Sequence, residues 1–172
     1  MLPLRLETVI GAGGVAAWEA LVATLPEGPL YHGTSLARAR LVMAEGFRSS
    51  FGRIVDDEKV AAYWGRPCVA ANFAYRSACA DQTPPAIIQA SLEDVLASGD
   101  PRPLRTTCDD CDEEYPSWRE CHADTGSFWV KGGRHVRGLI LHVVDVPVLV
   151  EPRPHDPVLD ACYGYGAALL VR

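Results

Sequence analysis

The stretch LYHGTS (residues 30–35) decides the fold of this chain, because it joins a strand to the start of a helix. Its apolar beginning is strand-like up to His32, and the following glycine is expected to end the strand. Ser35 has the side-chain type that caps helix N-termini. Apolar residues then recur at helical spacing over 36–44, and Gly46 suits the position that ends a helix. The stretch therefore predicts a strand, a tight turn and an amphipathic helix.

The rest of the chain alternates strand-like and helix-like segments. Strands are expected at 59–64, 86–92 and 127–131, with a strand pair or one long bent strand at 136–150, and helices at 15–25, 69–80 and 93–97. No βαβ unit with a glycine fingerprint occurs among them. This order predicts an α+β domain with a mainly antiparallel sheet.

Length and composition predict a single domain over residues 1–172. The net charge of −6 disfavours non-specific nucleic-acid binding, which depends on neutralising phosphates. No apolar run is long enough to span a membrane, and the charged residues in the first 22 positions are unlike a signal peptide. We therefore expect a cytoplasmic protein without a membrane partner.

Residues 98–126, rich in Asp, Pro, Cys and Thr, are expected to form one long acidic excursion from the core. Between Glu93 and Asp124 there are ten acidic residues and only three arginines. Within the excursion lie Cys108, Cys111, Cys121 and His122, which could offer ligands to zinc. The adjacent Cys-His pair is spaced poorly for a tetrahedral site, so reduced thiols are the preferred interpretation.

The residues at 32–35 combine several features of a ligand site. A glycine lets a ligand approach the backbone, and the helix N-terminus offers unpaired N–H groups. The imidazole of His32 adds a directional donor or acceptor. Four arginines follow closely in the sequence, at positions 38, 40, 48 and 53. This combination suits an anionic ligand with polar rings, such as a dinucleotide; the alternative is a histidine that only caps a strand and a solvated basic helix face.

The run LYHGTSLARARLVMAEGF (residues 30–47) resembles the first motif of the ADP-ribosyltransferase superfamily, in its diphtheria-toxin and poly(ADP-ribose) polymerase branch. The run AYW (62–64), followed by VAANFA (69–74), is similar to the next motif of that branch. A strand at 87–92 then comes in the expected order. The resemblance covers residues 30 to about 92. It implies an ADP-ribosyltransferase-like fold of split, mainly antiparallel β-sheets with flanking helices.

The resemblance also implies roles for individual residues. His32 would hydrogen-bond the hydroxyls of the nicotinamide-side ribose of NAD, and the backbone of Gly33 would bind the nicotinamide carboxamide. Tyr63 would stack on the nicotinamide ring, the alternative being a plain core aromatic. Thr34 would lie beside the dinucleotide or only help to cap the helix.

The pyrophosphate of the dinucleotide would face arginine side chains. Arg48 and Arg53, on the loop after the helix, are better placed for this than Arg38 and Arg40 on the helix itself.

The third motif departs from the family pattern. Active members carry a Glu at the start of a late strand, where its charge supports the oxocarbenium-like ribosyl group. Ser127 occupies that position here and supplies no charge. Glu120 is the preferred substitute, as a carboxylate just upstream, and Glu114 and Asp124 are weaker candidates.

The sequence therefore predicts an NAD-dependent ADP-ribosyltransferase that cleaves the nicotinamide–ribose bond and transfers ADP-ribose to an unidentified acceptor. Its proposed catalytic set is His32, Tyr63 and Glu120. Three alternatives stay open: a non-catalytic module that binds NAD, ADP-ribose or a protein partner, an RNA 2′-phosphotransferase-like enzyme, and a zinc-stabilised structural domain.

Overall fold

A computed structural model describes residues 7–47, 54–55, 58–104 and 115–144 of the chain. These ranges contain five helices and seven strands. In chain order they are α1 (Glu7–Thr24), β1 (Leu30–Ser35), α2 (Leu36–Glu45), β2 (Ile54–Val55), β3 (Glu58–Gly65), α3 (Pro67–Asp81), β4 (Pro85–Ala90), α4 (Leu92–Ser98), β5 (Asp100–Arg102), α5 (Trp118–Thr125), β6 (Ser127–Lys131) and β7 (Ile140–Val143).

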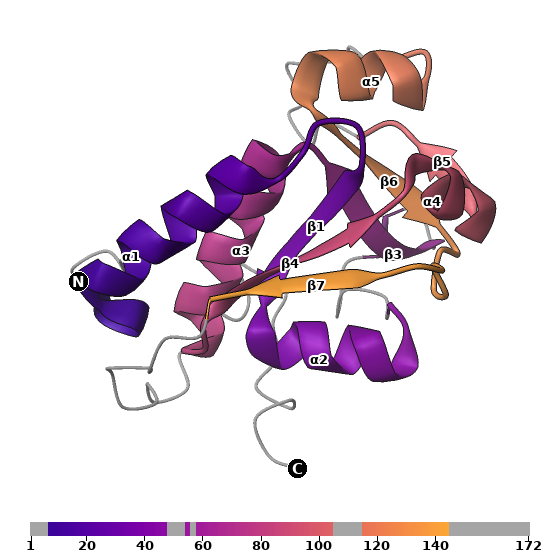
Figure 1. Cartoon of the computed structure of the whole chain (residues 1–172). Helices are drawn as coiled ribbons and strands as arrows, with labels where there is room; N and C mark the ends of the chain where they lie inside the picture. Colours follow the sequence, from indigo (N-terminus) through magenta and orange to yellow (C-terminus); the bar gives the residue numbers. More distant parts are fainter. Residues whose placement is uncertain (1–6, 48–53, 56–57, 105–114, 145–172) are drawn as a thin grey trace.

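The strands form one antiparallel sheet in the order β5-β6-β3-β1-β4-β7, with β2 paired to β3. All the pairings described are antiparallel. Helices lie on both sides of this sheet (Figure 1). The expected α+β class with a mainly antiparallel sheet is confirmed.

The sheet parts along the line between β1 and β3. β1 pairs with β4 along its whole length, from Leu30 opposite Ala90 to Ser35 opposite Pro85. Its described register with β3, in contrast, is the single pair Tyr31 and Gly65. Beyond that pair the backbones of the two strands no longer form a ladder. We call this the β1–β3 seam.

Each face of the sheet carries its own hydrophobic core, because alternate residues of a strand point to opposite faces. The α3-side core contains the buried residues Trp18, Leu25, Tyr31, Ala70, Ala74, Ala78, Cys79 and Ile87. The α2-side core contains Leu30, Ala39, Phe47, Ala62, Trp64, Ala86, Ile88, Ala90, Val95, Phe128 and Val130. Helices α1 and α3 thus cover one face, while α2, α4 and α5 pack toward the other (Figure 1).

Most expected elements are present, with shifted ends. Ser35 is the N-cap of α2 and accepts a hydrogen bond from the backbone N–H of Arg38, while Gly46 ends the helix with φ +82°. The strand expected to end at His32 continues through its glycine to Ser35, three residues further. The expected strand pair at 136–150 is represented by β7, and residues 145–150 lie outside the described part of the chain.

The segment expected as an acidic excursion contributes regular structure. β5 extends the sheet beside β6, and α5 packs against the start of β6. Ser117 caps α5 and Gly126 ends it with φ +75°. Residues 105–114, between these elements, lie outside the described residues.

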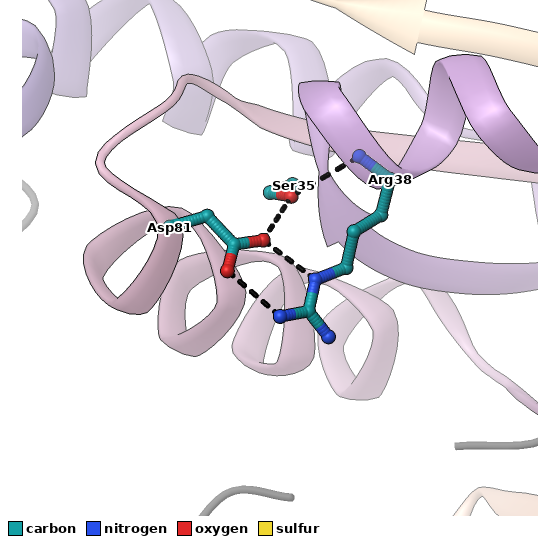
Figure 2. A network of polar contacts seen from close by, with 3 residues as sticks. All are labelled: Ser35, Arg38 and Asp81. Carbon is teal, nitrogen blue, oxygen red and sulfur yellow. Dashed lines mark hydrogen bonds and ion pairs between the residues drawn. The ribbon is translucent and has the colours of Figure 1, made fainter. Parts of the chain in front are cut away.

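A polar network joins the ends of α2 and α3 (Figure 2). The carboxylate of Asp81 accepts Nε–H and Nη2–H of Arg38 at 2.6 and 2.7 Å. It also accepts the hydroxyl of Ser35 at 2.5 Å. The side chains of Arg38 and Asp81 are only 19% and 13% exposed, so this network ties the C-terminal end of β1 to the end of α3.

Within the described ranges, no helix is both long and apolar enough to cross a membrane.

Candidate functional site

His32 lies on the α2-side face of β1, directly beside the seam. Its Nδ1 atom is 2.8 Å from the backbone oxygen of Tyr63. Because a carbonyl only accepts, Nδ1 carries the proton and Nε2 is the acceptor nitrogen of the neutral ring. No described residue bonds to Nε2. The imidazole therefore bridges the two strands where their ladder is interrupted and keeps one acceptor for a ligand.

The electrostatic surroundings keep His32 neutral. Burial lowers the pKa of His32 below its ordinary value of 6.5, the hydrogen bond to Tyr63 opposes this, and the nearby charge of Arg38 lowers the pKa further. A neutral imidazole can accept a hydrogen bond from a hydroxyl group, which an imidazolium cannot do.

Two aromatic rings hold the imidazole in place. Phe47 meets it edge-on at a centroid distance of 5.0 Å, and Trp64 lies at 6.0 Å. Phe47 and Trp64 also contact each other at 5.3 Å. The buried indole Nε1 of Trp64 has no hydrogen-bond acceptor within the part of the chain that the structure describes. This cluster thus combines a fixed acceptor on His32 with an unsatisfied donor on the neighbouring strand.

Gly33 is required by the packing of α3 on β1. A Cβ at this position would lie 1.7 Å from the backbone oxygen of Ala70 and 2.8 Å from the backbone nitrogen of Ala74. These are backbone atoms of a helix, which cannot move aside as a flexible side chain would. The sequence predicted that a ligand would approach the backbone closely at this glycine. In the structure, helix α3 makes this close approach.

Tyr63 lies on the α3-side face of β3, opposite to the face that carries His32. Its ring is nearly parallel to that of Phe73 on α3, with an interplanar angle of 19° and a centroid distance of 6.4 Å. Aromatic faces bind planar rings by stacking, so this pair offers aromatic surface to a flat ligand. The Phe73 side chain is 40% exposed, so solvent reaches this pair.

The two faces meet at the seam. Gly33 follows Tyr31 by two residues on β1, and Tyr63 precedes Gly65 by two residues on β3, so both lie just past the last paired position. The ring of His32 lies on the α2-side face of the seam, while the Tyr63–Phe73 pair lies on the α3-side face. The structure thus places His32, Gly33 and the backbone of Tyr63 at the seam, while the Tyr63 ring lies on the face opposite to His32.

The position expected for a catalytic Glu is occupied by a buried serine. Ser127 is the first residue of β6, lies opposite Gly65 in register, and is 4% exposed. Its hydroxyl donates to the backbone oxygen of Trp64 at 3.1 Å. This position therefore provides a polar contact within the sheet and no negative charge.

The candidate substitute carboxylates lie on α5. Glu120 is exposed, and its backbone N–H and carboxylate both face the capping hydroxyl of Ser117, at 3.3 and 3.4 Å. Asp124 accepts a hydrogen bond from the hydroxyl of Tyr115. Neither carboxylate is described in contact with His32, and Glu114 lies outside the described residues.

The other predicted ligand contacts have different surroundings. Thr34 is 4% exposed and follows His32 and Gly33 along β1, opposite Ala86. Arg38 is engaged by Asp81, and Arg40 is exposed on α2. Arg48 and Arg53 lie outside the described residues.

Of the residues considered for zinc, only Cys121 and His122 are described. The thiol of Cys121 is buried, contacts the backbone oxygen of Ser127 at 3.3 Å and accepts the N–H of Leu104 at 3.2 Å. His122 packs on Phe128, and its Nε2 is buried without a partner among the described residues. In the same ranges, no group of three or more potential metal ligands occurs.

Comparisons with known proteins give no relative: no protein-family model, no curated protein and no solved structure matches this chain. The geometry around the seam is therefore the basis for assigning a function.

Phe73 is the site residue that the sequence analysis did not assign to the ligand. In the sequence it is one apolar residue of a small-residue helix. Its place ten positions after Tyr63 was the available signal, since that interval leads from the end of β3 into the second turn of α3. The pairing of the two rings, however, depends on how α3 packs on β1.

Proposed function

We propose that this chain is an ADP-ribosyltransferase-like domain that binds NAD at the β1–β3 seam, cleaves the nicotinamide–ribose bond and transfers ADP-ribose to an acceptor. The observation that carries the proposal is the 2.8 Å contact between His32 Nδ1 and the Tyr63 backbone oxygen at the point where the two strands part. It supports a single ligand site made from the motif that contains His32 and the motif that contains Tyr63, which are separated by about thirty residues in the sequence.

The nicotinamide ring would lie between Tyr63 and Phe73. Their rings are nearly parallel, with centroids 6.4 Å apart, and aromatic faces bind planar rings by stacking. A ring held between both faces would require the two side chains to separate to about 7 Å between their planes. The backbone of Gly33 would bind the carboxamide, since the ladder between β1 and β3 has ended one pair earlier. This arrangement would orient the leaving group.

His32 would bind the ribose next to the nicotinamide. Its protonated Nδ1 is held by Tyr63, so Nε2 would accept a hydrogen bond from a ribose hydroxyl. The lowered pKa of His32 supports this role, because it keeps the ring neutral at physiological pH.

The reaction would break the bond between C1′ of the ribose and the ring nitrogen of nicotinamide, with the bonding electrons leaving on nicotinamide. The acceptor nucleophile would then bond to C1′ and lose its proton. A carboxylate beside the oxocarbenium-like ribosyl group would lower the barrier by its negative charge. Glu120 is the residue assigned to this task, which would require its carboxylate to leave Ser117.

A non-catalytic module that binds NAD or ADP-ribose is the second candidate. It is favoured by Ser127, a buried and hydrogen-bonded hydroxyl at the position where the resemblance implies a glutamate. In that case the seam would bind the dinucleotide without turnover.

Incubation of the purified protein with NAD, with separate measurement of binding and of free nicotinamide, tests both candidates. Release of nicotinamide that is lost in His32→Ala and in Glu120→Gln supports the transferase with its assigned carboxylate. Binding without release supports the module. His142→Ala is the matched control, because His142 is also a partly buried strand histidine but bonds to Gln89 on β4, away from the seam. Failure of the wild-type protein to bind NAD would refute both.

A further inference from the structure

The loop between β6 and β7 packs against the end of α2, next to the His32 cluster. The backbone N–H of Phe47 donates to the carbonyl of Arg134 at 2.7 Å. A Cβ on Gly46 would lie 2.5 Å from that carbonyl oxygen and 2.8 Å from Nδ1 of His135. Since the ring of Phe47 also meets His32 at 5.0 Å, one residue connects this loop to the proposed site.

The loop carries a concentration of positive charge in an acidic chain. The run KGGRHVR (residues 131–137) contains three basic residues and no acidic one, while the whole chain has a net charge of −6. The side chains of Arg134 and Arg137 are exposed. Neither guanidinium group has an ion-pair or hydrogen-bond partner among the described residues.

Other arginines in the described ranges have protein partners for their guanidinium groups. Arg38 binds Asp81, and Arg102 binds Asp100 at 2.6 Å. Arg66 donates to the backbone oxygen of Ala123 at 3.0 Å. Arg134 and Arg137 therefore keep their full hydrogen-bonding capacity for a ligand.

The backbone that presents these two arginines is anchored on both sides. Val136 and Leu139 pack against the α2-side core. A Cβ on Gly133 would meet Ser98 Oγ and a methyl group of Val130, each at 2.9 Å. The carboxylate of Asp94 on α4 would lie 3.3 Å from a Cβ on Gly138, and it accepts the hydroxyl of Ser91 at 2.6 Å. The two guanidinium groups thus extend into solvent from a fixed base.

We propose that Arg134 and Arg137 bind the pyrophosphate of the dinucleotide whose nicotinamide lies at the Tyr63–Phe73 pair. This rests on the proposed function. A guanidinium group presents parallel N–H donors that match two phosphate oxygens, and two such groups match the two negative charges of a pyrophosphate. The buried residue Phe47 contacts the His32 ring and donates its backbone N–H to the carbonyl of Arg134, so the loop lies on the same side of the sheet as His32. This assignment places the phosphate ligands on a segment of the chain far from the arginines at 48 and 53.

The test is calorimetric titration of the full chain with NAD, ADP-ribose, nicotinamide and inorganic pyrophosphate. The double variant Arg134→Ala/Arg137→Ala is expected to bind NAD and ADP-ribose at least about tenfold more weakly, since hydrogen bonds to charged groups are lost. Its affinity for nicotinamide is expected to be unchanged. Wild-type pyrophosphate binding is expected to disappear in the same variant.

Arg40→Ala/Arg76→Ala is the matched control, because both side chains are exposed, lie on helices and have no described partner. It removes the same charge as the test variant. It is expected to change each affinity by less than about threefold, because salt screens exposed charges that lie far from the ligand. Equal losses in both double variants would overturn the assignment to this loop, and so would an unchanged affinity of the Arg134/Arg137 variant for ADP-ribose.

The same titrations give a different pattern if the proposed binding of NAD is wrong. If the wild-type protein binds no NAD but binds pyrophosphate through Arg134 and Arg137, the anion site stands and the nicotinamide site is refuted. If it binds neither NAD nor pyrophosphate, the anion site is refuted as well.

Discussion

Asp81, the last residue of α3, holds Arg38 of α2 by two hydrogen bonds of 2.6 and 2.7 Å, across 43 residues of sequence. This pair fixes the end of β1, because Ser35 between β1 and α2 donates to the same carboxylate. Figure 2 shows the side chains of Ser35 and Arg38 converging on the carboxylate of Asp81.

Asp81→Asn should lower the free energy of unfolding by about 2 kcal/mol, because a half-buried guanidinium loses a charged acceptor. Urea denaturation followed by tryptophan fluorescence measures the change. Asp100→Asn is the matched control; Asp100 and Arg102 are 55% and 48% exposed, and such surface pairs contribute at most about 1 kcal/mol. Equal effects of the two substitutions would contradict the role assigned to the network.

Gly33→Ala should lower the free energy of unfolding by more than about 3 kcal/mol, because the new methyl group would overlap the backbone of α3. Gly13→Ala is the control. Nothing lies within 4 Å of a Cβ at Gly13 in α1, so alanine there should raise stability by up to about 1 kcal/mol through helix propensity. A Gly33→Ala protein as stable as the wild type would show that α3 does not pack on this strand as described.

Phe73→Ala should weaken nicotinamide and NAD binding by about three- to tenfold, which corresponds to one aromatic stacking contact. Its effect on stability should be small for an aromatic residue, because the side chain is 40% exposed. Met43→Ala, which removes a 42% exposed side chain from α2, should leave the affinity unchanged. Titration with nicotinamide decides the matter, and an unaffected Phe73→Ala variant would remove Phe73 from the site.

Stability should decrease as the pH falls below 6.5. Burial lowers the pKa of His32, His122 and His142, and for His122 the charge of Arg66 adds to the effect. Below pH 6.5 the unfolded chain therefore binds protons that the folded chain does not, and each group reduces the free energy of unfolding by at most about 1.4 kcal/mol per pH unit. Above that pH both states are neutral and the effect vanishes.

Urea denaturation at intervals between pH 8.0 and 5.5 measures this dependence. His142→Gln should reduce the slope, because one of the three titrating groups is removed while hydrogen bonding to Gln89 stays available. Stability that is constant or increases from pH 7.0 to 5.5 would contradict the lowered pKa values.

Local signals in the sequence were sufficient for most helices and strands. Ser35 and Gly46 mark the two ends of α2 through capping chemistry that depends only on neighbouring residues. β6 was predicted with its observed bounds from an apolar run after a glycine. The α+β class follows from the order of such segments.

The remaining features depend on tertiary packing. The glycine in β1 was expected to end the strand, but α3 lies on it and the strand continues. The sequence of α5 lacks an apolar repeat, and the interval from Ser117 to Glu120 was its overlooked capping signal. In β7 the strand begins only at Ile140, because Gly138 adopts φ +63° and Val136 and Leu139 pack into the core from a loop.

The motifs predicted that His32, Gly33 and Tyr63 lie near one another, and neighbouring strands place the His32 ring in contact with the Tyr63 backbone. Their binding of a common ligand stays a prediction. Arg38 was considered for an anion, but its partner Asp81 is far away in the sequence. The pairing of Phe73 with Tyr63, and the position of the β6–β7 loop against Phe47, depend on packing that no local pattern encodes.

The contact between Gly33 and α3 also bears on how relatives of this chain could be recognised. If the chain binds a dinucleotide as proposed, a relative that had lost this binding would still need the glycine, because any larger residue collides with the main chain of Ala70. Retention of the glycine in a relative would therefore report on the packing of α3 against β1, whereas retention of the two facing rings would report on the proposed ligand.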